Sequence, residues 1–180
     1  MNLVYSIPDK LYYFKNFLDY PAYKKLHYDV FKSNLISLKS VEKDWDEKLT
    51  YGHYNFTQKT ELDKNNPLLL KLKILIKTNQ FHKIDYNNFN FVLHSMENGA
   101  GINWHDDHNH EYGITYYINR RWNNKFGGEL LFTHKTANGF VPITGNSLLI
   151  IKAPLLHKVV NVTKPIISRK TIQIFVDKDV

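Results

Sequence analysis

The stretch FNFVLHSMENGAGINWHDDHNHEYGITYYIN, residues 89–119, marks a change in the character of the sequence. Before it the chain favours helices, and from Phe89 onwards it consists of short apolar runs separated by turns. Turn signals rich in glycine, asparagine or proline stand at 98–101, 123–128, 138–139 and 142–145. They separate predicted strands at 89–96, 102–107, 113–119, 129–133, 147–152, 156–162 and 169–176.

These strands, after a helical preface, predict a mainly β fold with N-terminal helices. The expected architecture is a double-stranded β-helix, a jelly-roll barrel, with helices packed on one sheet. We interpret residues 1–180 as a single domain, in which 1–88 form the helical preface and first strands and 89–180 form the jelly-roll core. Helices are expected from Tyr20 to about Lys32 and from Leu68 to Asn79, with a strand or two beside them.

The segment from Tyr51 to Phe56, with the polar stretch that follows it to Asn66, is a candidate mobile loop near a substrate. Its composition lacks the apolar periodicity of the predicted helices on either side. The sequence gives this loop and the rest of the preface no identifiable motif.

Composition excludes several classes of function. The chain has 180 residues and no cysteine, which rules out disulfides, thiolate metal sites and cysteine nucleophiles. It has no apolar stretch of membrane-spanning length and no signal-peptide pattern at its start, so a cytoplasmic protein without a membrane partner is expected. The net charge of +7 comes mainly from scattered lysines, because only three of the 24 basic residues are arginine. This pattern argues against a nucleic-acid partner.

The run Trp104-His105-Asp106-Asp107 is the strongest chemical signal in the sequence. On a strand, residues i and i+2 share a face, so His105 and Asp107 are expected to point the same way. His157, on a late predicted strand, could supply a third ligand. Two histidines and one carboxylate on one side of a metal suit a non-haem Fe(II) site with open positions.

Arg169 begins the last predicted strand, and it is one of few arginines in a chain that otherwise uses lysine. Its strand face carries Thr171, Gln173 and Phe175, a mixed polar and aromatic set that would line a cavity and suit a bound dianion. The opposite face carries Lys170 and the isoleucines, which would pack against helices. Tyr117 shares a strand face with Thr115, and its hydroxyl would need a partner inside a barrel.

Taken together, these motifs resemble the Fe(II)/2-oxoglutarate-dependent dioxygenases, in particular their prolyl 4-hydroxylase-like branch. The resemblance spans Phe91 to Asp177 and rests on the order and spacing of the whole set. The matching pieces are Asn98–Gly101, Trp104–Asp107, Thr115–Asn119, Trp122, Gly127–Leu130, Pro142 with Gly145, His157 and Arg169.

The resemblance implies an enzyme that hydroxylates a C–H bond of a prolyl residue in a peptide or protein. It implies Fe(II), 2-oxoglutarate and O2, with ascorbate as an optional addition, and no catalytic residue beyond the metal centre. The implied iron ligands are His105, Asp107 and His157, and the implied 2-oxoglutarate contacts are Arg169, Tyr117 and Thr171. The oligomeric state is left open.

One departure from the family concerns the position about ten residues before the first iron ligand, where many prolyl hydroxylases carry a tyrosine. Here this position is Ser95, next to Met96.

Four other functions stay open. One is hydroxylation of a free amino acid or another small molecule, and another is demethylation of nucleic acid by an AlkB-type enzyme. That family normally has a second arginine six residues after the first, where this chain has Phe175. A zinc hydrolase would need a general base, for which Asp106 and Glu111 are the nearby candidates. A metal-binding jelly roll without catalysis is the remaining alternative.

Overall fold

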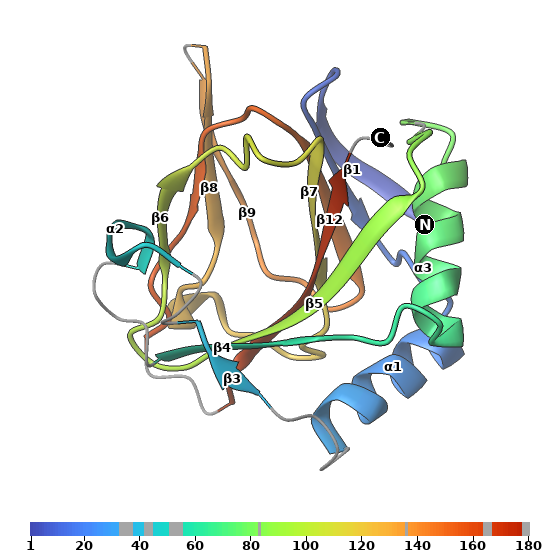
Figure 1. Cartoon of the computed structure of the whole chain (residues 1–180), viewed down its shortest axis with the longest axis horizontal. Helices are drawn as coiled ribbons and strands as arrows, with labels where there is room; N and C mark the ends of the chain where they lie inside the picture. Colours follow the sequence, from blue (N-terminus) through green and yellow to red (C-terminus); the bar gives the residue numbers. More distant parts are fainter. Residues whose placement is uncertain are drawn as a thin grey trace.

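Two antiparallel sheets form the framework of the protein (Figure 1). The computed structural model describes residues 1–32, 38–41, 45–50, 56–82, 84–135, 137–163 and 167–177. The larger sheet has the strand order β1-β2-β10-β7-β12-β5-β4-β3, and the smaller sheet has the order β6-β11-β8-β9. Side chains from both sheets meet in one apolar cluster that includes Tyr117, Leu149, Leu130 and Phe132. This arrangement confirms the predicted jelly roll.

The N-terminal part contains more strand than the sequence suggested. Its elements are β1 (Asn2–Ile7), β2 (Leu11–Lys15), α1 (Tyr20–Lys32), β3 (Lys39–Ser40), α2 (Glu47–Thr50), β4 (Thr57–Glu61) and α3 (Pro67–Thr78). The sequence predicted only a strand or two beside the helices. Four strands form instead, because they add to the edges of the larger sheet, where neighbours outweigh local propensity. Of the candidate loop at 51–66, residues 51–55 lie outside the described residues, the middle part is strand β4, and 62–66 form a turn before α3.

The two long helices follow their local sequence signals. Asp19 accepts a hydrogen bond from the Ala22 amide at 2.9 Å, which caps the start of α1. The Asn66 side chain caps α3 in the same way, with Pro67 at the first helical position. Figure 1 shows α1 and α3 on the side of the larger sheet that faces away from β6 and β8. The expected helical layer on one sheet is therefore confirmed.

The strands of the C-terminal part lie close to their predicted positions in the sequence. They are β5 (Asn88–Met96), β6 (Ile102–His105), β7 (Tyr112–Tyr117), β8 (Leu130–His134), β9 (Ala137–Val141), β10 (Ser147–Lys152), β11 (His157–Val159) and β12 (Arg169–Asp177). The predicted turn at Asn138-Gly139 was wrong, because both residues lie within β9 and pair with β8. A turn signal read from residue types alone was overridden by this pairing.

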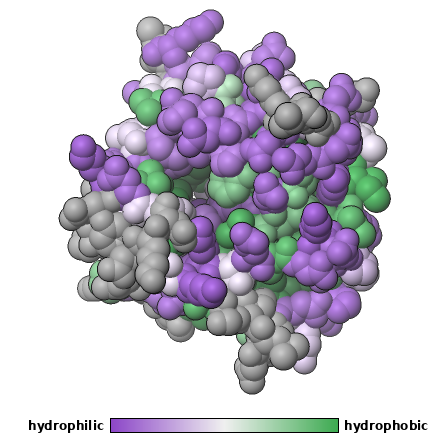
Figure 2. Space-filling model, in the orientation of Figure 1, coloured by the Kyte–Doolittle hydropathy of each residue, from purple (hydrophilic) through white to green (hydrophobic). Residues whose placement is uncertain are grey.

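The outer surface is mainly polar, while the core lies on both faces of the larger sheet. Hydrophilic side chains dominate the periphery of the face in Figure 2, and hydrophobic ones gather toward its middle. The larger apolar cluster lies between the sheet and the helices, and it includes Ile172 and Ile174 of β12 and Leu69 and Leu72 of α3. No helix among the described residues is long and apolar enough to span a membrane.

Candidate functional site

Three side chains that the sequence singled out as metal ligands meet at one end of the smaller sheet. Strands β6 and β11 are antiparallel neighbours, and their register pairs His105 directly with His157. Asp107 lies against both rings, with its oxygens 3.6 Å from Nε2 of His105 and 3.5 Å from Nε2 of His157. One ligand atom from each residue lies within 4.8 Å of the other two, so the triad can hold a metal ion.

Both histidines are oriented by backbone carbonyls. Nδ1 of His105 lies 2.7 Å from the Asn103 carbonyl oxygen, and Nδ1 of His157 lies 2.7 Å from that of Leu155. Because a carbonyl only accepts hydrogen bonds, Nδ1 carries the proton and the Nε2 lone pair is directed at the triad centre. Burial lowers the pKa of His157, and the neighbouring His105 lowers it further. The lowered pKa favours the neutral ring that a metal requires.

Asp107 reaches the triad by a route that strand alternation did not predict. Strand β6 ends at His105, and Asp107 adopts the left-handed conformation with φ of 54°. Its carboxylate then lies over Gly113 of β7, where a Cβ atom would be only 2.3 Å from Oδ2. Gly113 is thus a site residue that the sequence analysis missed, although a glycine inside a strand pattern signals a close approach.

A cavity of about 300 Å³ lies beside the triad, between the two sheets. Its lining combines Thr115, Gln173, Phe175 and His94 of the larger sheet with Trp45. A wider outer hollow of about 620 Å³ shares His105, Asp107 and Leu49 with this cavity. The triad therefore stands between an enclosed inner space and an open outer one.

Arg169 is almost completely buried, with 1% of its surface exposed. Its Nε donates to the Gly128 carbonyl at 3.0 Å, and its Nη1 lies 3.4 Å from the Met96 sulfur. Within the described part of the chain, no acidic side chain forms an ion pair with it, and burial lowers its pKa. A buried guanidinium without a counter-ion is costly, so this group is suited to an anionic ligand.

Tyr117 supplies a second unsatisfied group beside this arginine. The Cζ atom of Arg169 lies 5.6 Å from the centre of the Tyr117 ring. The Tyr117 hydroxyl is buried and makes no hydrogen bond of ordinary geometry to a described residue, although the Arg169 guanidinium lies beside it. Burial outweighs the opposing effect of the Arg169 charge and raises the pKa of Tyr117 to about 12. It remains a neutral donor, which suits hydrogen bonding to a carboxylate oxygen.

Thr171, the third predicted contact, lies between Tyr117 and His94 in the register of the larger sheet. It pairs with Tyr117 in the register of β12 and β7, and its hydroxyl accepts from Gln173 at 3.2 Å. Gln173 in turn accepts from Thr115 at 2.9 Å. The predicted polar face of β12 is therefore confirmed as an interior surface. Lys170 points the other way, with its ammonium 4.6 Å from the Phe31 ring centre.

Ser95 of β5 lies on the side of the larger sheet that faces the helices, next to a residue that faces the cavity. Phe89, Phe91 and Leu93 of β5 belong to the cluster under the helices, and alternation places Ser95 on that same side. The side chain of β5 that lines the cavity is His94. The side chain that this strand presents to the cavity is therefore His94, one residue before Ser95.

The candidate bases for a hydrolase are engaged elsewhere. An oxygen of Asp106 lies 2.8 Å from Nδ1 of His108, and a Glu111 oxygen lies 3.7 Å from the Lys152 ammonium. Neither residue lines the inner cavity. This geometry offers no support for a hydrolytic water activated inside that cavity.

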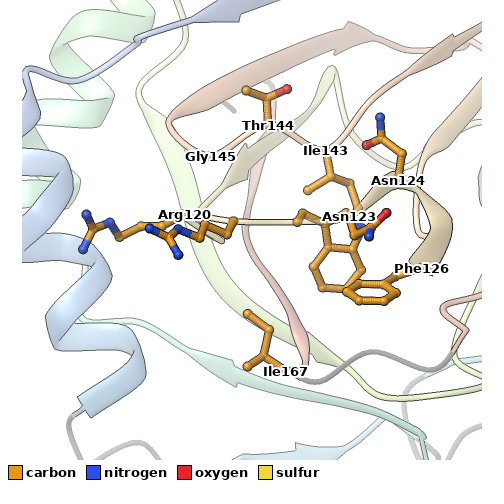
Figure 3. A pocket seen from close by; sticks show the side chains of 10 residues that line it. Arg120, Asn123, Asn124, Phe126, Ile143, Thr144, Gly145 and Ile167 are labelled. Carbon is orange, nitrogen blue, oxygen red and sulfur yellow. The ribbon is translucent and has the colours of Figure 1, made fainter.

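A separate hollow of about 670 Å³ lies at the opposite end of β7 from the triad (Figure 3). Trp122, Phe126, Ile143 and Ile167 form its apolar lining. The Arg120 side chain extends away from these rings and donates to the Tyr20 hydroxyl of α1 at 3.2 Å. The hollow contains none of the predicted site residues, so its size does not make it the reaction site.

The sequence profile of the 2OG-Fe(II) oxygenase superfamily matches residues 91–177, the segment that contains the triad and Arg169. Residues 91–177 therefore carry the domain of the 2OG-Fe(II) oxygenase superfamily. This family uses Fe(II), 2-oxoglutarate and O2, which agrees with the expected cofactors. The triad fits the metal, and the buried Arg169 guanidinium, which has no acidic partner among the described residues, fits a dicarboxylate together with the Tyr117 hydroxyl.

Several solved structures share the fold of this chain at low sequence identity. A prolyl-4-hydroxylase from Pseudomonas putida is similar with a TM-score of 0.74 and 14% identity, over 95% of this chain and 94% of the other. A prolyl hydroxylase from Trichoplax adhaerens, in complex with a hypoxia inducible factor peptide fragment, gives 0.72 and 13%, over 95% and 84%. OsALKBH1 gives 0.64 and 10%, over 98% and 100%. No curated protein sequence matches the chain.

Proposed function

We propose that this protein is an Fe(II)- and 2-oxoglutarate-dependent hydroxylase that acts on a prolyl residue of a peptide or protein. One observation carries the cosubstrate assignment. The buried Arg169 guanidinium, with no acidic partner among the described residues, lies beside the unpaired Tyr117 hydroxyl. A dicarboxylate would neutralise the first group and accept a hydrogen bond from the second.

The proposed roles follow from the geometry of each group. His105, Asp107 and His157 bind iron through two Nε2 atoms and a carboxylate oxygen. Arg169 and Tyr117 bind the distal carboxylate of 2-oxoglutarate. Thr171, the register partner of Tyr117, contacts the same ligand. Iron with its bound cosubstrate and O2 supplies the oxidising chemistry that converts a C–H bond to C–OH, with succinate and CO2 as coproducts.

The protein's own contribution is orientation and exclusion of water. The carbonyls of Asn103 and Leu155 fix both histidine rings before any metal binds. The inner cavity is largely enclosed by side chains of both sheets, so a ligand there would be shielded from solvent. Asp107 stays in place because Gly113 leaves room for its carboxylate.

A prolyl substrate is supported by the outer hollow and by the similar structures. The hollow passes from Trp104, which is 42% exposed, to the two metal-ligating residues His105 and Asp107. It is large enough for an extended peptide side chain and its neighbours to approach the triad from outside. Phe175 and His110, whose rings lie 4.5 Å apart, offer an aromatic wall for a proline ring.

The test is an anaerobic titration of the metal-free protein with Fe(II) and then 2-oxoglutarate, monitored by the visible charge-transfer absorption. We expect a band in the wild type and a band in Arg169→Ala only at much higher 2-oxoglutarate concentration. Binding of Fe(II) alone should be unchanged in that variant. Bound metal without a band at any concentration would contradict the use of 2-oxoglutarate.

Substrate class is then tested by succinate formation and product mass. Proline-containing peptides should give succinate with a +16 Da peptide product. Turnover with free amino acids and none with peptides would favour the small-molecule alternative, and loss of a methyl group from nucleic acid would favour the AlkB-type alternative. A cytoplasmic location, stimulation by ascorbate and the organisation of residues 1–180 as one domain stay predictions.

A further inference from the structure

His94 occupies a position in the barrel that the assigned site does not explain. It lies on β5, where the register pairs it with Thr171 of β12, and Thr171 in turn pairs with Tyr117 of β7. The three residues therefore form one row across the interior face of the larger sheet. His94 also lines the cavity that contains the metal triad, and only 3% of its surface is exposed.

One nitrogen of the buried His94 ring has no hydrogen-bond partner among the described residues. This nitrogen is Nδ1, and the main contact of the ring is the edge of Trp45 at 5.2 Å. Burial, with the nearby Arg169 charge, lowers the pKa of His94 to about 3. The ring is thus neutral at physiological pH, with one N–H donor and one acceptor nitrogen.

Unpaired buried polar atoms are rare in folded proteins, and here they cluster. In the described part of the chain, four side chains have one: Thr57, His82, His94 and Tyr117. His94 and Tyr117 flank Thr171 in the same row, and Arg169 lies one step further along the same face of β12. Such atoms normally mark a missing ligand or water, because leaving them unpaired is unfavourable.

We propose that His94 is a further cosubstrate-binding residue, whose ring N–H donates a hydrogen bond to a carboxylate oxygen of bound 2-oxoglutarate. The inference rests on the proposed function, which it extends by a contact on the β5 side of the cavity. Tyr117 and His94 would then hold the ligand from opposite sides of Thr171. These contacts would explain why His94 Nδ1 and the Tyr117 hydroxyl have no hydrogen-bond partner without the ligand.

The experiment compares three substitutions at His94 with one control. His94→Phe keeps an aromatic ring against Trp45 and removes both nitrogens. His94→Asn keeps a donor close to the Nδ1 position, whereas His94→Gln moves it toward the Nε2 position. His82→Phe is the matched control, because His82 also has an unpaired nitrogen but contacts Tyr12 and Tyr112, away from the cavity.

The readout is equilibrium binding rather than turnover. Manganese(II)-loaded protein is titrated with 2-oxoglutarate in a calorimeter, and manganese affinity is measured separately. We expect His94→Phe to weaken 2-oxoglutarate binding on the order of tenfold or more, with manganese affinity unchanged. His94→Asn should retain most of the affinity, His94→Gln should lose it, and His82→Phe should match the wild type.

Ligand-free stability gives a second, independent readout. Because Nδ1 is unpaired in the free protein, His94→Phe should leave the melting temperature unchanged or raised without ligand, and reduce its rise on adding 2-oxoglutarate. A structural histidine would show the opposite. If His94→Phe does not fold, the contrast between His94→Asn and His94→Gln decides.

Two results would overturn the inference: wild-type 2-oxoglutarate affinity in His94→Phe, or equal affinity in the Asn and Gln variants. Arg169→Ala in the same titration separates this failure from that of the proposed function. Wild-type binding that is lost in Arg169→Ala and kept in His94→Phe removes only the role of His94. Absence of 2-oxoglutarate binding by the wild type removes both.

Discussion

The two faces of the larger sheet differ sharply, and β12 shows the contrast within one strand. On the helix side, Ile172, Ile174 and Val176 are completely buried in the apolar cluster beneath α1 and α3. On the barrel side, Arg169 and Thr171 are just as buried, yet the arginine has no counter-ion among the described residues. Equal burial therefore accompanies apolar packing on one face and the proposed ligand site on the other.

The difference teaches how the site tolerates its own polar groups. Apolar burial on the helix side contributes about 25 cal/mol per Å² and can offset the unfavourable burial of unpaired groups on the barrel side. The Tyr117 hydroxyl and the His94 nitrogen are left without partners although the fold surrounds them. Substitutions on the barrel side should thus affect binding more than folding, and those on the helix side the reverse.

Asp107 should give the largest effect on function. Asp107→Ala removes one of three metal ligands, so Fe(II) binding and turnover should fall by on the order of a thousandfold or more. Alanine is strained at the left-handed φ of Asp107, so Asp107→Asn serves as the control that keeps the turn. Metal affinity is measured by equilibrium titration and stability by urea unfolding. Full activity in Asp107→Ala would exclude the ligand assignment.

Ile174→Ala should have the largest effect on folding. Removing a completely buried side chain beneath the helices should lower the free energy of unfolding by about 2–5 kcal/mol. Gln173→Ala, its neighbour on the barrel side, should lower it by much less. Urea denaturation of both variants measures the difference. Similar losses in the two variants would mean that the faces do not divide stability and binding.

Gly113→Ala should impair the metal site without removing a ligand. The added Cβ would lie 2.3 Å from Oδ2 of Asp107, so the carboxylate must move away from the histidines. We expect Fe(II) affinity to fall by roughly tenfold to a hundredfold, about 1.4–2.8 kcal/mol. The control is the double variant with Asp107→Asn, where the two losses should not add. Full additivity would separate Gly113 from the metal site.

Tyr117→Phe should have the smallest and most diagnostic effect. Removing the unpaired hydroxyl should leave the metal-free protein equally stable or more stable, by up to about 1 kcal/mol. The same change should weaken 2-oxoglutarate binding by about 1–2 kcal/mol through the lost hydrogen bond. Thermal unfolding with and without ligand reports both. A loss of stability without ligand would indicate that the hydroxyl supports the fold instead.

The sequence predicted the second half of the fold well because turn-forming residues separate its strands clearly. Turns such as Asn98–Gly101 and the alternation in Arg169–Phe175 define strands from local residues alone. The first half gave poorer predictions, since β1 and β2 have no alternation that marks a half-buried strand. They are strands because β10 offers an edge to pair with, and β1 pairs with β2.

The candidate site divides in the same way. The identities of His105, Asp107, His157 and Arg169 were evident from motif and spacing, and the structure brings the first three together. The way Asp107 reaches the two histidines was not predictable, because it depends on the left-handed conformation of Asp107 after β6 and on a glycine in another strand. His94 was missed because its partners are on strands distant in the sequence.

The sequence by itself determined the set of chemical groups, the positions of most core strands along the chain and the resemblance to the family, because residue type and spacing carry these directly. Only the tertiary structure decided which buried polar atoms remain unpaired. That property belongs to no single residue: it arises when β5, β12 and β7 align His94, Thr171 and Tyr117 in one row, of which His94 lines the cavity. Hydrogen bonds act over about 3 Å, so only the folded arrangement can leave one unmade.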